Sequence, residues 1–173
     1  REIIMNNLIL LMKTLTFGLV LSVMSFSSIA EDKASLEKNK IDEVLNSFHQ
    51  AAADAQAKPY FDLLSQNAIF LGTDASERWS KEQFKAFAVP CFSKGTGWLY
   101  TPTERNISLV KKGQVAFFDE LLFSESYGTC RGSGVLIKTK QGWKISQYNL
   151  SIPMPNGLAK ALVKQIKSFE QLQ

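Results

Sequence analysis

The sequence predicts one α+β domain, with helices first and a run of long strands after them. Two observations lead to this prediction. From residue 35 to about residue 57, apolar side chains recur at helical spacing, and Lys58-Pro59 then ends the helix. From residue 116 to residue 155, three runs rich in aromatic and β-branched residues alternate with glycine-containing turns, which indicates an antiparallel meander. Such a sheet, curled around helices, leaves a cone whose open end is a cavity.

Residues 1–30 have the pattern of a signal peptide. Lys13 precedes an uncharged apolar run over residues 14–29, and Ser28-Ile29-Ala30 places small residues where a signal peptidase cleaves. We therefore expect cleavage after Ala30, export to the periplasm or the exterior, and no membrane anchor in the mature protein; an uncleaved anchor is the alternative. Met5 and Met12 both offer a start, and the sequence does not choose between them.

Composition narrows the classes of partner and cofactor. Residues 31–173 have the length of one ordinary domain, and the formal charge of +4 is spread along the chain without a basic cluster interleaved with aromatics. We therefore expect no nucleic acid partner. One histidine, two cysteines and no nucleotide or flavin motif predict a site without metal or cofactor. In an oxidising compartment, Cys91 and Cys130 can form a disulfide or remain two buried thiols, and the sequence leaves both open.

Shorter elements follow the first helix. Pro59 suits the first turn of a helix over 59–64, residues 68–72 are expected to form a short strand, and residues 73–78 a loop. Ser80 and Gln83 match a capping box that opens a helix from Ser80 to about Phe92, which Pro90 should bend or end.

Four long strands and a last helix complete the chain. The first strand covers 98–110, with Pro102 marking an edge or a bulge, and the meander supplies the other three. The predicted domain covers 31–156. A C-terminal amphipathic helix over 157–173, capped by Asn156, can close the cavity mouth, dock on the sheet or bind a partner.

Four polar residues lie on meander strands that should otherwise build a core: Asp119, Arg131, Gln147 and Asn149. We assign Asp119 to the inner face, where Arg131 on the next strand would be its partner, either as a structural ion pair or as a ligand-binding carboxylate and guanidinium. Gln147 and Asn149 share a face with Trp143 and Ile145, and either bind a ligand or are buried amides. Glu120, on the opposite face of its strand, is expected to be a surface or interface charge.

Aromatic residues and the single histidine are the remaining candidates. Trp79, Trp98 and Tyr100 are expected to form core or cavity wall, and each can alternatively stack on a ligand. His49 lies beside the apolar stripe of the first helix and can act as a general base near neutral pH. The alternative is a helix histidine at the edge of the core, since no carboxylate or cysteine neighbours it in the sequence.

Several short motifs, in order, resemble the SnoaL-like branch of the nuclear transport factor 2-like superfamily, over about residues 41–156. They are Phe70-Leu71-Gly72-Thr73-Asp74, Glu77-Arg78-Trp79, Gly97-Trp98, Phe118-Asp119-Glu120, the stretch from Cys130 to Leu136 with its Arg-Gly-Ser-Gly, and Trp143 to Leu150 with its Tyr-Asn. The resemblance implies a cone-shaped α+β fold (a cystatin-like roll), frequent dimerisation through the sheet, and a cavity used for binding or for isomerisation, cyclisation or dehydration.

The sequence departs from the enzymes of that superfamily, which typically place an Asp–His pair or a Tyr–Asp constellation in the cavity. Here the last strand presents Gln147 and Asn149 where such enzymes have a histidine, and a neutral amide cannot abstract a proton. Any base must therefore be Asp119 or His49.

Three hypotheses follow. The first is an exported homodimer that binds a small, largely apolar ligand in the cone without chemistry, using Trp79, Trp98, Tyr100, Arg131, Gln147 and Asn149. The second is a cofactor-independent isomerase, cyclase or hydratase, with Asp119 or His49 as base and Arg131, Asn149 or Tyr148 holding the oxyanion. The third is a dimeric assembly module with a vestigial cavity.

Overall fold

The computed structural model describes residues 31–172, with Lys112 described in its backbone alone. The predicted signal peptide lies outside this range. A helix covers 31–53, and the chain divides after Lys40 into two units, so that residues 41–53 of this helix belong to the larger unit. In the smaller unit, Lys40 donates a hydrogen bond to Glu37 over 3.1 Å. No helix within residues 31–172 is both long enough and apolar enough to span a membrane.

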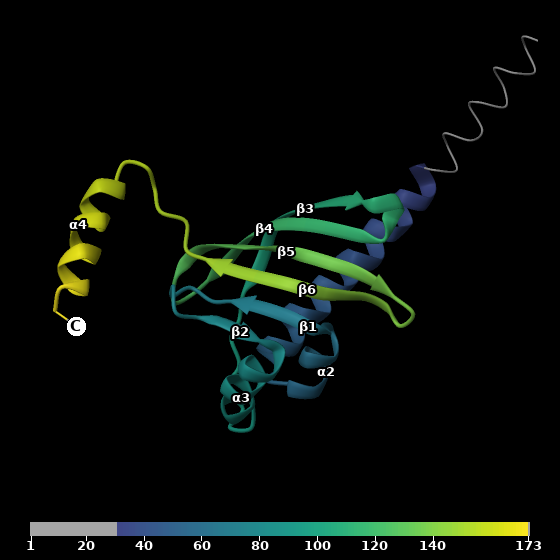
Figure 1. Ribbon diagram of the computed structural model, residues 1–173, viewed down its shortest axis with the longest axis horizontal. Helices are drawn as coiled ribbons and strands as arrows, with labels where there is room; N and C mark the ends of the chain where they lie inside the picture. Colours follow the sequence, from purple (N-terminus) through teal and green to yellow (C-terminus); the bar gives the residue numbers. More distant parts are fainter. Residues whose placement is uncertain (1–30, 173) are drawn as a thin grey trace, which may run out of the picture. The chain divides into compact units, whose positions relative to one another are not determined.

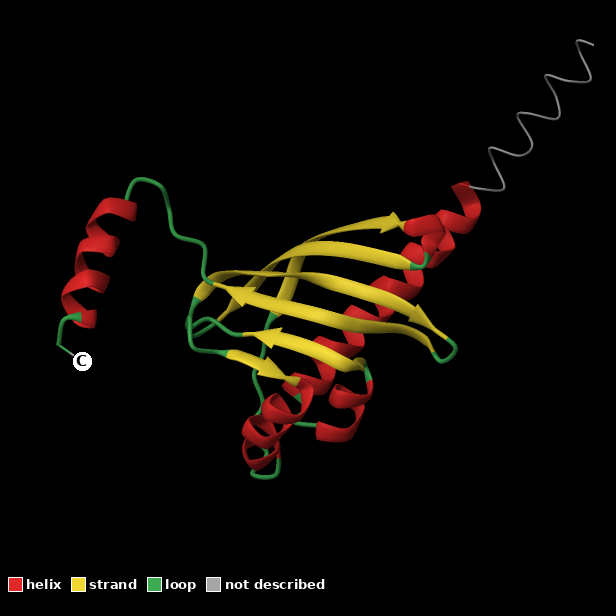
Figure 2. Ribbon diagram, viewed as in Figure 1, coloured by secondary structure: helices red, strands yellow, loops and turns green. Residues whose placement is uncertain are grey.

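The larger unit is an α+β domain, as predicted (Figures 1 and 2). After the first helix, its elements are α2 (Ala57–Asp62), β1 (Leu64–Leu71), β2 (Arg78–Ser80), α3 (Lys81–Phe92), β3 (Thr101–Val110), the 3₁₀ helix η1 (Lys111–Gly113), β4 (Val115–Ser124), β5 (Gly128–Thr139), β6 (Gly142–Ser151) and α4 (Ala159–Glu170).

The six strands form one curved sheet in the order β2-β1-β6-β5-β4-β3, which Figure 2 shows in yellow with α2, α3 and residues 41–53 of the first helix along one side. Neighbouring strands are antiparallel except β1 and β6, which are parallel. The predicted meander is therefore confirmed as β4, β5 and β6, and β3 is the edge strand beside it.

Local chemistry places α3 as predicted. The Ser80 hydroxyl accepts from the Gln83 backbone N–H over 3.3 Å, and the Gln83 side chain accepts from the Ser80 backbone N–H over 2.9 Å. This reciprocal capping box satisfies two donors at the helix start. Pro90 lies inside α3 without ending it before Phe92. The short strand β2, which the sequence reading missed, pairs with β1 through Trp79 opposite Phe70.

The core lies between the helices and the concave face of the sheet, and it is rich in aromatic rings. Phe70 of β1 stacks on Phe84 of α3 with ring centroids 3.9 Å apart, and Trp79 stacks on Phe84 at 5.5 Å. Trp98 packs on Phe92 at 4.6 Å. Both tryptophans are therefore wall and core residues held by neighbouring rings.

The face assignment on β4 was wrong. Phe118, Glu120 and Leu122 point to the core and are buried, whereas Phe117 and Asp119 are exposed. Both faces of this strand carry large apolar residues, so alternation alone gave no sign of which face is inside. Glu120 is consequently the buried carboxylate, and Asp119 is not.

The face assignment on the second half of β6 was also wrong, because a β-bulge interrupts the strand. Ile145 pairs with Leu136 and Gln147 with Val135, so that Ser146 is an extra residue. One extra residue reverses which side chains point inward. Trp143 and Ile145 are buried before the bulge and Tyr148 after it, while Gln147 is exposed.

Two further expectations can be compared with the structure. Cys91 and Cys130 are free thiols, the first half-buried and the second buried, so the disulfide that the sequence left open is not formed. The last helix begins after Leu158 instead of Asn156, and its first residue has no side-chain cap. None of the residues of α4 is buried.

Candidate functional site

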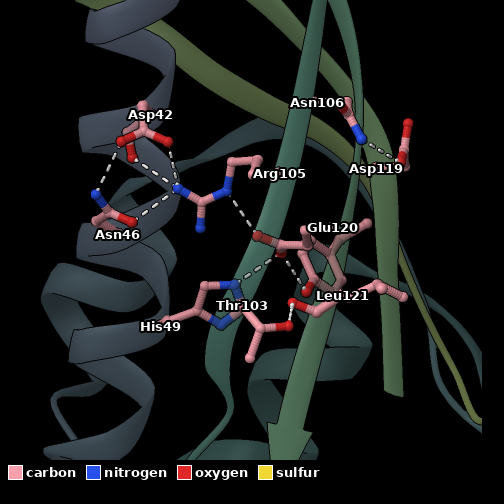
Figure 3. A network of polar contacts seen from close by, with 10 residues as sticks. Asp42, Asn46, His49, Thr103, Arg105, Asn106, Asp119, Glu120 and Leu121 are labelled. Carbon is pink, nitrogen blue, oxygen red and sulfur yellow. Dashed lines mark hydrogen bonds and ion pairs between the residues drawn. The ribbon is translucent and has the colours of Figure 1, made fainter. Parts of the chain in front are cut away.

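The candidate site is centred on Glu120, a residue that is 1% exposed and whose side chain extends from β4 into the core. Three donors converge on its carboxylate (Figure 3). Oε1 lies 2.7 Å from His49 Nε2 and accepts from the Tyr148 hydroxyl over 2.9 Å. Oε2 accepts from Arg105 Nε over 2.7 Å. A buried carboxylate needs such partners, because desolvation of an unpaired charge is costly.

Arg105 extends this network from the sheet to the first helix, as Figure 3 shows. Its Nη1 donates to Asp42 Oδ1 and to Asn46 Oδ1, each over 2.7 Å, and reaches the Asp42 backbone carbonyl at 3.3 Å. The guanidinium therefore joins β3, β4 and one face of the helix. Its buried Nη2 makes no hydrogen bond to any residue in the described range, so the two N–H donors of this nitrogen have no acceptor there.

The charges of the network determine the proton positions. Burial by itself raises the pKa of Glu120, but the hydrogen bonds and positive charges of His49 and Arg105 outweigh burial and hold this pKa below its ordinary value. Glu120 is therefore ionised near neutral pH and can only accept hydrogen bonds. It follows that His49 donates this hydrogen bond through Nε2–H whether the ring is charged or neutral; in the neutral ring the lone pair is on Nδ1.

Tyr148 completes the network as a permanent donor. Burial, and then the negative charge of Glu120, raise the pKa of Tyr148 well above its ordinary value. Its hydroxyl thus keeps its proton across the physiological range. The ring of Tyr148 also packs against Phe48 with centroids 5.0 Å apart and against Phe70 at 5.6 Å, so the site is bounded by aromatic side chains.

Two cavities meet at His49. An open cleft of about 230 Å³ lies between the helix, at Asn46, His49, Gln50 and Ala53, and the segment over 99–102. A hole of about 20 Å³ in the interior is bordered by Phe48, Ala52, Tyr60, Phe70, Trp98, Tyr148 and Leu150. His49 and Tyr100 border both cavities. The hole is large enough for about one water molecule, so the interior of the cone is nearly filled.

Tyr100 is half-buried at this boundary. Burial, with smaller contributions from the nearby Cys130, Tyr127 and Glu77, raises the pKa of Tyr100 to about 12. Its hydroxyl is therefore protonated at any physiological pH. Residues 96–100 have no regular secondary structure, although Trp98 N–H donates to the Ala52 carbonyl over 3.2 Å and ties the segment to the helix.

The structure brings some of the predicted site residues together and separates the others. His49, Trp98 and Tyr100 border the cavities, and Trp79 is part of the core. Asp119, Arg131 and Gln147 are exposed, and Asn149 is half-buried on the same outer face of the sheet. The predicted Asp119–Arg131 pair is wrong: Asp119 pairs across the strands with Ser133, and its carboxylate accepts from Asn106 over 3.2 Å.

Sequence reasoning missed the acidic centre of the site and its cation. Glu120 was assigned to the outer face, and Arg105, Asp42 and Asn46 were not named. The sequence carries one signal, a glycine at position 132 inside a predicted strand. In the structure Gly132 lies on β5 opposite Glu120. A Cβ at Gly132 would lie 2.4 Å from the Tyr148 hydroxyl and 2.7 Å from Glu120 Oε1, so this glycine leaves room for the buried polar groups.

With this fold and this site, the chain belongs to the SnoaL-like domain family, whose model matches residues 41–155. The sequence-based resemblance to that family is thereby confirmed. No curated protein matches the chain.

Solved structures give the same fold. An NTF2-like protein of unknown function from Pseudomonas putida KT2440 has a TM-score of 0.59 and 14% identity, and the match covers 71% of this chain and 90% of that one. A candidate scytalone dehydratase from Novosphingobium aromaticivorans DSM 12444 has a TM-score of 0.61 and 10% identity, with coverages of 71% and 88%. A candidate dehydratase of the NTF2-like family from Streptomyces avermitilis has a TM-score of 0.58 and 11% identity, with coverages of 68% and 96%. At these identities the likeness shows the fold alone.

Proposed function

We propose that this protein binds a small, largely apolar molecule at the cleft beside His49. The polar end of the ligand contacts His49 Nδ1 and the Tyr100 hydroxyl, and its apolar part lies along the apolar walls of the cleft, beside the interior hole. The observation that carries the proposal is that His49, oriented by Glu120, borders both the open cleft and the interior hole.

The composition of the two cavities favours this ligand class. The walls of the cleft include Ala53, Leu99 and Pro102, and the interior is lined almost entirely by aromatic and aliphatic side chains. Ligand sites commonly combine such apolar walls with few, well-oriented polar groups.

A second candidate function is cofactor-independent proton transfer, as in a dehydratase or isomerase. The observation that favours it is the His49–Glu120 pair. A neutral imidazole with its lone pair on Nδ1 can accept a proton from a substrate in the cleft, and the ionised Glu120 would stabilise the imidazolium that forms. Two proteins of this fold are described as candidate dehydratases.

Binding is tested first by native mass spectrometry of the purified protein, followed by denaturation to release any bound molecule. As a defined probe we choose 2-naphthol, a planar apolar molecule with one hydroxyl, observed by saturation-transfer NMR. Ala53→Trp fills the cleft, and Ala86→Trp, on the exposed side of α3, is the matched control. The proposal predicts affinity at least about tenfold weaker in Ala53→Trp and unchanged in Ala86→Trp. Equal binding by both variants would contradict it.

His49→Gln separates the two candidate functions. This change retains a polar group in the cleft but removes the proton acceptor. A binding protein should lose affinity to a modest extent, whereas an enzyme should lose turnover of any substrate found while its KM stays close to that of the wild type.

We also propose a homodimer formed through the outer face of the sheet. Phe117 and Phe123 are 50% and 46% exposed there, and Leu121 lies between them on β4. Exposed apolar patches of this kind commonly mark interaction surfaces. The native mass should be that of a dimer, and Phe117→Lys should give a monomer; a monomeric wild type would contradict the proposal.

Export remains a proposal that rests on the sequence of residues 1–30. N-terminal sequencing of the protein recovered from the periplasm of a bacterial host should find Glu31 as the first residue. Recovery of the uncleaved chain from the cytoplasm or a membrane would contradict this proposal.

A further inference from the structure

A larger groove, of about 780 Å³, lies where α2 runs into β1 and the turn between β5 and β6 comes close to them. It shares no lining residue with the cleft beside His49. Leu64 and Ile137 are its apolar lining residues, and the remainder of the lining is polar. The groove is thus more polar than the aromatic interior and suits a different kind of ligand.

An irregularity in the sheet creates this groove. Leu64 of β1 pairs with Ile145 of β6, and the next pair is Ile69 with Gln147. Residues 65–68 therefore stand opposite Ser146 alone, and the two strands cannot form a regular ladder there. Ser65, Gln66 and Asn67, together with Ser146, line the groove with hydroxyl and amide groups.

Three lysines add positive charge to this polar lining. Lys81 Nζ donates to the Leu64 carbonyl over 2.9 Å, and Lys144 Nζ donates to the Asp62 carbonyl over 2.6 Å. Each ammonium group is held by a backbone oxygen through one of its three protons, which leaves donors for a ligand. Lys140, in the β5–β6 turn, lines the same groove. Burial lowers the pKa of Lys81, consistent with an ammonium group that is drawn partly out of water.

The one carboxylate of the groove is already paired with a lysine outside its lining. Asp62 Oδ2 accepts from Lys58 Nζ over 2.5 Å, one helical turn away. The charges of Asp62 and Glu82 offset part of the charge of Lys81, and Asp62 also acts on Lys144. The groove lining nevertheless has three lysines against one carboxylate, so it keeps a net positive charge. A concave surface lined by one sign of charge raises the local concentration of opposite ions.

We propose that this groove binds a phosphate group. Three ammonium groups suit its charge, and the surrounding hydroxyls and amides can donate to its several oxygens. The group can be carried by a free small molecule or by a lipid headgroup, which share this chemistry. The proposal is independent of the ligand site at His49.

The test uses inorganic pyrophosphate as the probe, titrated into the full protein by isothermal calorimetry at constant ionic strength. The variants are Lys144→Met and Lys140→Met, which keep the length of the side chain and remove its charge. Lys164→Met, on the exposed helix α4, is the matched control for net charge. We expect saturable binding that weakens at least about fivefold in each groove variant and changes less than about twofold in the control.

Two further arms make the result decisive. His49→Gln should bind pyrophosphate as the wild type does, because His49 does not line the groove. The phosphate proposal can therefore succeed or fail independently of the ligand site proposed at His49. Vesicles of phosphatidylglycerol in phosphatidylcholine identify a lipid source if they bind the wild type, release it on addition of pyrophosphate and fail to bind Lys144→Met. If binding does not saturate, or if Lys164→Met weakens it as much as the groove variants do, the groove is not a phosphate site.

Discussion

Replacement of Glu120 by glutamine probes the network most sharply. The carboxylate accepts from Tyr148 and His49 at Oε1 and from Arg105 at Oε2. Glutamine has nearly the same shape, but it offers one acceptor oxygen and one donor NH₂. In either orientation a donor then faces a donor, unless Tyr148 and His49 both turn from donors to acceptors. The substitution also leaves Arg105 in the core with one anionic partner fewer.

We expect Glu120→Gln to lower the free energy of unfolding by about 3–5 kcal/mol, the usual cost of breaking a buried charged pair. A domain of this size has about 5–15 kcal/mol of stability, so the variant should still fold. With a urea m value of about 2 kcal/mol/M, the unfolding midpoint falls by about 1.5–2.5 M.

The assay is urea unfolding at neutral pH, followed by tryptophan fluorescence and far-UV circular dichroism. The matched control is Glu125→Gln, the same substitution at an exposed position in the turn after β4, where we expect less than about 0.5 kcal/mol. A Glu120→Gln midpoint within about 0.3 M of the wild type would refute the reasoning. An equal loss in Glu125→Gln would refute it as well, because the burial of Glu120 would then explain nothing.

Three other predictions follow from the same contacts. The pKa of Glu120 is held below its ordinary value of 4.5 in the folded state. The contribution of Glu120 to the free energy of unfolding is therefore full above pH 4.5 and is lost as the pH falls through the folded-state pKa. Urea midpoints measured from about pH 6 to about pH 3 should drop more steeply for the wild type than for Glu120→Gln. Tyr148→Phe removes one hydrogen bond to a charged group and should cost about 1.5–3 kcal/mol in chemical denaturation; no loss would mean that the hydroxyl is dispensable to Glu120. Gly132→Ala puts a methyl group 2.4 Å from the Tyr148 hydroxyl and should cost about 1–3 kcal/mol in the same assay, whereas Ser133→Ala should be nearly neutral; equal effects would disprove the close approach.

Local signals in the sequence predicted much of the fold. The capping box at Ser80 and the alternation of the meander involve residues close together in the chain, and both are present in the structure. The errors came from features that depend on distant partners. The extra residue Ser146 reverses the facing of Gln147 and Asn149, and only the pairing with β5 reveals it. The three-residue strand β2 exists because β1 is beside it.

The candidate site was predictable only in part. His49 was named as a possible base, but its partner Glu120 lies 71 positions away, so a search for neighbouring carboxylates in the sequence could not find it. On β4, the adjacent acids Asp119 and Glu120 point to opposite faces, and both faces also carry apolar residues. The alternation of side chains along a strand means that one of the two acids is buried, but it does not indicate which one. The helix over residues 41–53 packs against the sheet, and this packing determines which of the two acids is buried. The spacing of residues along the sequence carries no information about such packing.

The central claim is that an ionised Glu120 fixes His49 with its proton on Nε2 and its lone pair on Nδ1. His49 is the one histidine of the chain, so a long-range ¹H–¹⁵N correlation spectrum of the labelled protein reports on this ring without ambiguity. In the neutral form of the ring, which the ¹⁵N shifts themselves identify, we predict a protonated Nε2 and an unprotonated Nδ1 in the wild type, with the pattern lost or reversed in Glu120→Gln. A wild-type ring protonated on Nδ1, or one that averages between the two tautomers as a free imidazole does, would contradict the claim.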